Sequence, residues 1–156
     1  MPLCIAGFSG WETYAYNGMI YAAENGADIV SNSWSGNPYS IANQEAVNYA
    51  AGLGIIIVAG AGNENNNVLF YPASYQNVVS VASVNIDDTR TFYSNFNYKV
   101  DIATPGGGTE GGILSTMPDD QYGLEMGTSM ATPLAAGCLG LLKSYHPDGS
   151  NDQLIT

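Results

Sequence analysis

Basic residues are scarce in this chain of 156 residues. Three lysines and arginines stand against 14 aspartates and glutamates, which gives a formal net charge of -11. Such a field repels phosphate backbones and anionic lipid headgroups, so we expect no nucleic-acid partner and no membrane partner. The acidic excess suits the solubility of an exported or salt-exposed protein, and a preference for basic substrates is the weaker alternative.

The sequence also lacks a disulfide framework, because it has only two cysteines, Cys4 and Cys138. Both lie in apolar segments, so we expect them to fill the core, with one disulfide between them as the alternative. Residues 1–4 carry no basic segment of a signal peptide, and no apolar run reaches the length of a membrane span. Carboxylates at calcium-loop spacing are absent as well, so we predict no metal and no cofactor.

The residues that are present predict one α/β domain. Hydrophobic residues make up 46% of the chain and glycines number 19, which suits a single core with many tight turns. Strands are expected over 2–6, 27–33, 54–61, 77–84 and 100–103, part of a hairpin over 111–116, helices over 11–25, 40–51 and 129–146, and a final turn near 150. This alternation predicts a mostly parallel sheet flanked by helices, with a cleft at the carboxyl ends of the strands.

The sequence GTSMATP at residues 127–133 opens the long apolar helix. Pro133 fits only the first turn of a helix, so Ser129 is expected near the helix N-terminus. The free N–H groups and the helix dipole there favour negative charge, which suits a nucleophile whose attack turns a carbonyl oxygen into an anion. The simpler alternative is a capping residue in front of a buried helix.

Residues 127–133 resemble the GTSMA[ST]P signature of the subtilisin-like serine proteases, the subtilases. Four further segments are similar to landmarks of that family and follow in its order: 26–36 (GADIVSNSWSG), 55–64 (IIIVAGAGNE), 71–73 (YPA) and 103–106 (ATPG). The resemblance implies a subtilisin-like three-layer fold over residues 1–156, incomplete at both ends. It also implies that the parent protein is a serine endopeptidase that acts on polypeptides and is secreted.

The resemblance assigns a role to each site residue. Ser129 is the expected nucleophile. The side-chain amide of Asn63 is the expected oxyanion donor, together with the Ser129 N–H; the alternative for Asn63 is an ordinary turn residue. The substrate is expected to bind as an added strand along Ser33, Trp34, Ser35 and Gly36, with Ala61 and Gly62 as the facing wall of the first specificity pocket.

Three further positions carry expectations from the family. Phe70 falls where subtilases place a pocket-base residue, although a core or loop aromatic is an equal alternative. Pro72 is expected to follow a cis peptide bond. The family often holds a weak cation on main-chain carbonyls near Ala73, Tyr75 and Val78, but carbonyl ligands cannot be read from sequence, and we predict no metal here.

The Asp and His motifs of the family are absent from these residues. The one histidine, His146, lies 17 residues beyond Ser129 at the far end of the same helix, roughly 25 Å away, so it is not the base. Asp28, Asp87, Asp88 and Asp101 are expected in turns and on the surface. We therefore expect a partial catalytic domain that is inactive alone and whose partner is the missing N-terminal part of its own domain.

Two other functions stay open. One is a non-catalytic peptide-binding or structural domain derived from the protease fold, which would have no need to keep both Ser129 and Asn63. The other is a different serine hydrolase such as an esterase, in which a Gly-x-Ser-x-Gly elbow is expected; residues 127–131 lack its second glycine.

Overall fold

Parallel strands form the centre of the molecule. The computed structural model of the protein describes residues 11–155, with side chains from residue 14 on. Its elements, in order, are α1 (Trp11–Glu24), β1 (Ile29–Asn32), α2 (Ile41–Gly52), β2 (Ile56–Gly60), β3 (Val79–Val84), β4 (Ile102–Pro105), β5 (Ile113–Met117), β6 (Gln121–Glu125), α3 (Thr128–Tyr145) and α4 (Asn151–Ile155). Strands β1 to β4 pair side by side in chain order, all parallel, and β5 and β6 form a separate antiparallel hairpin.

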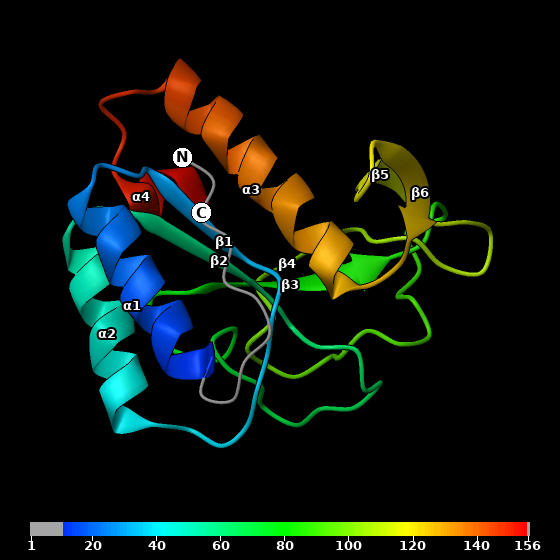
Figure 1. The fold of residues 1–156 in the computed structure, drawn as a ribbon, viewed down its shortest axis with the longest axis horizontal. Helices are drawn as coiled ribbons and strands as arrows, with labels where there is room; N and C mark the ends of the chain where they lie inside the picture. Colours follow the sequence, from blue (N-terminus) through cyan, green and yellow to red (C-terminus); the bar gives the residue numbers. More distant parts are fainter. Residues whose placement is uncertain (1–10, 156) are drawn as a thin grey trace.

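Helices cover both faces of the sheet (Figure 1). Alternate side chains of β2 point to opposite faces: Ile57 and Ala59 pack with α1 and α2, whereas Ile56 and Val58 pack with α3. Every residue of β2 is buried, which agrees with the continuous apolar run predicted there. The result is three layers, helix on sheet on helix, so the predicted fold class is confirmed.

Most element boundaries fall within two residues of those expected. Ser40 is the N-cap of α2, where its side chain accepts a hydrogen bond from the Asn43 N–H at 3.4 Å. The expected strand at 2–6, and Cys4 within it, lie outside the described residues. Two elements were not predicted: β6 as the second half of the hairpin, and the short helix α4 in place of a turn.

The expectation for Cys138 is wrong, because Cys138 is exposed and free. The face of α3 that packs on the sheet carries Ala131, Ala135 and Leu139. Cys138 lies one residue from Leu139, about 100° around the helix, which turns it out of that contact. It belongs instead to an outward apolar stripe with Leu134, Leu141 and Tyr145, which are 41%, 74% and 80% exposed.

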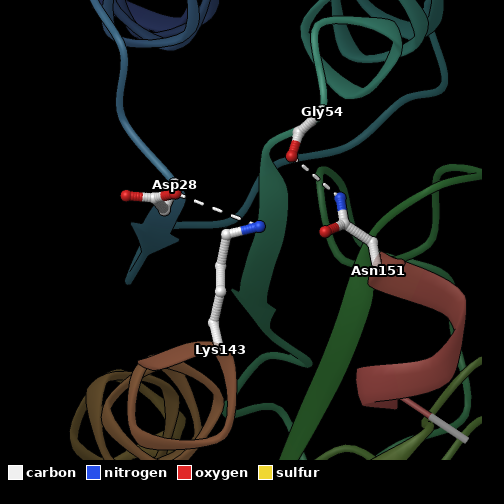
Figure 2. A network of polar contacts seen from close by, with 4 residues as sticks. All are labelled: Asp28, Gly54, Lys143 and Asn151. Carbon is white, nitrogen blue, oxygen red and sulfur yellow. Dashed lines mark hydrogen bonds and ion pairs between the residues drawn. The ribbon is translucent and has the colours of Figure 1, made fainter. Parts of the chain in front are cut away.

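Two polar contacts tie the helices to the end of the sheet away from the cleft. Figure 2 shows Lys143 of α3 beside Asp28, at 3.9 Å, and Asn151 of α4 donating a hydrogen bond to the Gly54 carbonyl at 2.9 Å. Asp28 is mostly exposed, so we assign the ion pair a small share of stability. None of the helices over residues 11–155 is both long and apolar enough to cross a membrane.

Candidate active site

Ser129 is the second residue of α3, two positions after the glycine that precedes the helix. Gly127 has φ +154° and is buried, and it is the N-cap of α3. The N–H of Ser129 lies in the first turn, where it has no acceptor within the helix. The helix start therefore presents a half-buried hydroxyl beside a free backbone donor, as expected for Ser129. The expectation that Pro133 lies in the first turn is wrong, because Pro133 is inside the helix.

A reciprocal pair of hydrogen bonds joins Ser129 to Ser33. The Ser33 hydroxyl donates to the Ser129 carbonyl at 2.8 Å, and the Ser129 hydroxyl donates to the Ser33 carbonyl at 3.3 Å. Ser33 directly follows β1, so this pair brings the carboxyl end of the first strand of the sheet against the start of α3. The predicted nucleophile and the first residue of the predicted substrate strand are thus in contact.

Asn63 is held by the residue before Ser129. The Asn63 Oδ1 accepts hydrogen bonds from the Thr128 N–H at 2.9 Å and from the Thr128 hydroxyl at 3.1 Å, and Thr128 Oγ1 accepts from the Gly62 N–H at 3.3 Å. Because Oδ1 is occupied, the Asn63 side chain has a fixed orientation. Its Nδ2 donates to nothing else between residues 11 and 155, so both of its hydrogens are available to an incoming acceptor.

The predicted site residues surround one hollow of about 280 Å³. It is lined by Ser33, Trp34, Ser35, Gly60, Asn63, Thr128 and Ser129. Ala61 and Gly62 are buried beside it and do not line it. The structure therefore brings together the two predicted catalytic groups and most of the predicted substrate strand, while the role of Ala61 and Gly62 as a pocket wall stays a prediction.

Gly36, the last residue of the predicted substrate strand, does not line the hollow. Its N–H and carbonyl are both paired with Tyr71, at 2.8 and 2.9 Å. Burial is the main reason that the pKa of Tyr71 is raised, and nearby tyrosines add to it. The bond between Tyr71 and Pro72 is cis, as expected, and Asn37–Pro38 is a second cis bond.

The described residues place no base beside Ser129. His146 is exposed and caps the far end of α3, where its ring contacts Tyr145. Phe70 is half-buried, and its place in a specificity pocket stays a prediction. Within residues 11–155, no group of three or more His, Cys, Asp or Glu side chains gathers as a metal site would need.

Gly106 and Tyr93 support Gly127 at the helix start. The Gly127 N–H donates to the Gly106 carbonyl at 2.9 Å, and the Tyr93 hydroxyl donates to the same carbonyl at 2.9 Å. Tyr93 is in turn hydrogen-bonded to the Ser83 hydroxyl at 2.7 Å. A Cβ on Gly106 would collide with Ser83 and lie 2.7 Å from the Gly127 carbonyl oxygen. The close approach of these two backbones thus requires glycine at 106.

Replacing Gly106 by alanine is expected to lower the free energy of unfolding by about 1–3 kcal/mol, because the added methyl must push the Gly127 backbone aside. Urea denaturation measures the change. Gly137→Ala is the matched control, since no atom lies within 4 Å of the added Cβ and alanine favours a helix interior. Equal stability of the Gly106→Ala variant and the unchanged protein would contradict this packing.

Sequence reasoning missed Thr128 as the anchor of Asn63. Threonine at that position belongs to the GTSMATP segment, but its partner is 65 residues away and no local pattern points to it. It also missed Tyr93, which supports Gly106 from the loop between β3 and β4, where no motif marks it.

Comparison with known proteins agrees with this geometry. A model of the subtilase family matches residues 6–155. Thermitase of Thermoactinomyces vulgaris is 43% identical over 143 residues, which is 92% of this chain and 50% of thermitase. The major intracellular serine protease of Bacillus subtilis (strain 168) is 38% identical over 94% of this chain and 46% of its own length.

Solved structures agree as well. A protease from Pseudoalteromonas arctica superimposes with a TM-score of 0.81 at 34% identity, covering 90% of this chain and 48% of that chain. A lanthipeptide protease superimposes with a TM-score of 0.84 at 23% identity, which supports the fold alone. The chain spans about half the length of the curated relatives named above. The resemblance drawn from the five sequence segments is confirmed: this chain belongs to the subtilase family.

Proposed function

We propose that this chain supplies the nucleophile, the oxyanion donor and the substrate strand of a serine endopeptidase that cleaves polypeptides. The observation that carries the proposal is the convergence of Ser129, Asn63 and Ser33 around one hollow, from three separate parts of the chain. A binding or structural domain has no need for a free amide donor beside a half-buried serine hydroxyl. An esterase is expected to carry a Gly-x-Ser-x-Gly elbow, and residues 127–131 lack its second glycine.

The chemistry follows from what each group can do. Ser129 Oγ forms a bond to the peptide carbonyl carbon, and its proton passes to a base. The carbonyl oxygen becomes an anion that accepts hydrogen bonds from Asn63 Nδ2 and the Ser129 N–H. The C–N bond then breaks, the amine leaves with the proton, and water releases the acyl group from Ser129. Backbone pairing along Ser33 and Ser35 holds the substrate in an extended form.

The base and the carboxylate that orients it are proposed to come from protein beyond these residues. Two features support this. Among residues 11–155, β1 has one sheet partner, β2, so one of its edges is unpaired. The outward stripe of α3 (Leu134, Cys138, Leu141 and Tyr145) also exposes apolar surface that nothing described covers. The other half of the relatives' length is the proposed partner for both surfaces.

The location of the parent protein is a lesser proposal. We propose that it acts outside the cell, supported by the net charge of -11. One relative is named as an intracellular protease, so action inside the cell is the alternative. Fractionation of the source culture, with detection of this chain in medium or in cells, decides between them.

Labelling with a fluorophosphonate tests the proposed function. The isolated chain is expected to react slowly, because none of residues 11–155 places a base near Ser129. The full-length protein is expected to be labelled within minutes and stoichiometrically, and peptide mapping by mass spectrometry should place the label on Ser129.

Rapid labelling of the isolated chain would contradict the need for an outside base. A full-length protein that neither takes up the label nor cleaves casein would overturn the endopeptidase proposal. If that protein still bound extended peptides, the peptide-binding alternative would replace it.

A further inference from the structure

A buried asparagine, Asn95, lies under the loop that carries Asn63. Asn95 is fully buried, and its side-chain amide makes four hydrogen bonds. Nδ2 donates to the Ala61 carbonyl and to the Glu64 carboxylate, both at 2.9 Å. Oδ1 accepts from the N–H groups of Glu64 at 3.1 Å and Asn66 at 3.2 Å. An asparagine side chain has two donors and two acceptor sites, so its capacity is fully used.

All of these contacts converge on one short segment. The Asn95 backbone N–H also donates to the Gly62 carbonyl at 3.0 Å. Five hydrogen bonds from one residue therefore fix the residues on both sides of Asn63, which is itself exposed. Gly62, with φ +105°, permits the close approach, because a Cβ there would collide with the Asn95 amide.

A second contact holds the far side of the same loop. Arg90 donates to the Asn65 side chain at 2.9 Å and to the Ser94 carbonyl, and its guanidinium lies 4.6 Å from the Phe96 ring centroid. The segment around Asn63 is thus clamped by residues from the loop between β3 and β4. Asn63 needs such support, because an oxyanion donor works only if it is already in place when the charge develops.

We propose that Asn95 is a positioning residue for the oxyanion donor Asn63, an inference that rests on the proposed endopeptidase function. Asn95 touches neither the hollow nor Ser129. It acts by holding the Gly62 and Glu64 backbones so that Thr128 can orient the Asn63 amide and leave Nδ2 aimed outward. Losing Asn95 should therefore misplace the donor while leaving the substrate strand along Ser33 to Gly36 intact.

The first test is steady-state kinetics of the full-length protein on a peptide substrate. Asn95→Ser is expected to lower kcat about tenfold. Asn97→Ser is the matched control: Asn97 is also buried, but its side chain hydrogen-bonds the Val68 carbonyl and the Lys99 N–H and makes no hydrogen bond with residues 61–66. Thermal unfolding of both variants shows whether their stabilities match. An equal kcat loss in Asn97→Ser at matched stability would overturn the proposal.

A double-mutant cycle separates positioning from a general structural role. In an Asn63→Ala background the donor is gone, so adding Asn95→Ser should lower kcat less than twofold further. The same tenfold loss in both backgrounds would overturn the proposal. If Asn95→Ser does not fold, Asn95→Asp takes its place, because the carboxylate keeps the shape of the side chain but cannot donate to Ala61 and repels Glu64.

An NMR measurement tests whether Asn95 positions Asn63 independently of any peptidase activity. In full-length protein labelled with ¹⁵N-asparagine, the side-chain NH₂ signals of Asn63 are expected to shift in Asn95→Ser and to stay in place in Asn97→Ser. Unshifted signals in Asn95→Ser would overturn the positioning role. If the protein has no peptidase activity but the signals shift as expected, the endopeptidase proposal fails while Asn95 is still shown to orient Asn63.

Discussion

Ser129→Ala in the full-length protein is expected to lower kcat for a peptide substrate by about 10⁶-fold, the loss known for the nucleophile of subtilisin. The reason is that Ser129 is the proposed nucleophile, and it lines one hollow together with Asn63 and residues 33–35. Without it no acyl group can be transferred to the protein, and only the oxyanion donors and binding remain to assist water.

Steady-state hydrolysis of a chromogenic peptide measures this loss. KM should stay within a few-fold of its usual value, because the replacement changes none of the residues proposed to pair with the substrate. Ser144→Ala is the control, since Ser144 is an exposed serine at the other end of the same helix. Activity of Ser129→Ala within tenfold of the unchanged protein would exclude Ser129 as the nucleophile.

Asn63→Ala is expected to lower kcat by about 10²–10³-fold, which is the effect known for the oxyanion asparagine of subtilisin. The structure adds a way to separate two roles of the side chain. Its Oδ1 anchors Thr128, and its Nδ2 is the free donor. Asn63→Asp keeps an acceptor for Thr128 but removes the donor and places a negative charge beside the developing anion. We therefore expect Asn63→Asp to lose at least as much activity as Asn63→Ala.

The kinetic measurement pairs these variants with Asn67→Ala, an exposed asparagine of the same loop whose replacement should leave kcat within twofold. If Asn63→Asp kept most of the activity while Asn63→Ala lost it, the anchoring of Thr128 would be the important role of Asn63, and its role as a donor would be wrong.

The sequence predicted the sheet better than it predicted the hairpin. The apolar run from Ile55 to Ala61 can only be buried on both faces, and β2 is. Strand β6 has the sequence QYGLE and is mostly exposed, so neither burial nor alternation marks it. Its pairing with β5 comes from the turn at Asp119 and Asp120, both at positive φ. Cys138 was misplaced because residues 133–142 of α3 carry no polar side chain, which hides the direction of its buried face.

The candidate site was predictable where a short motif contains the reacting group. Ser129 and Asn63 each sit in such a motif, and the structure brings both to one hollow. The groups that hold them were not predictable. Thr128 contacts Asn63, 65 positions away, Asn95 contacts Ala61, 34 positions away, and Gly106 contacts Gly127, 21 positions away. Polar side chains in loops carry no periodic signal that would reveal such contacts. Such contacts follow from the tertiary fold alone.

The length of chain between contacting residues has a consequence for how the site forms. Ser33 and Ser129 are 96 residues apart, and Asn63 and Thr128 are 65 apart. During folding, the helices α1 and α2 and the strands they pack against can associate through nearer contacts. The hollow cannot exist until α3 docks on the sheet, because residues of α3 form part of its lining. Closing such long loops is slow, because the entropy cost comes before any stabilising contact forms. The hollow therefore forms late in folding, when the rest of the sheet is already in place.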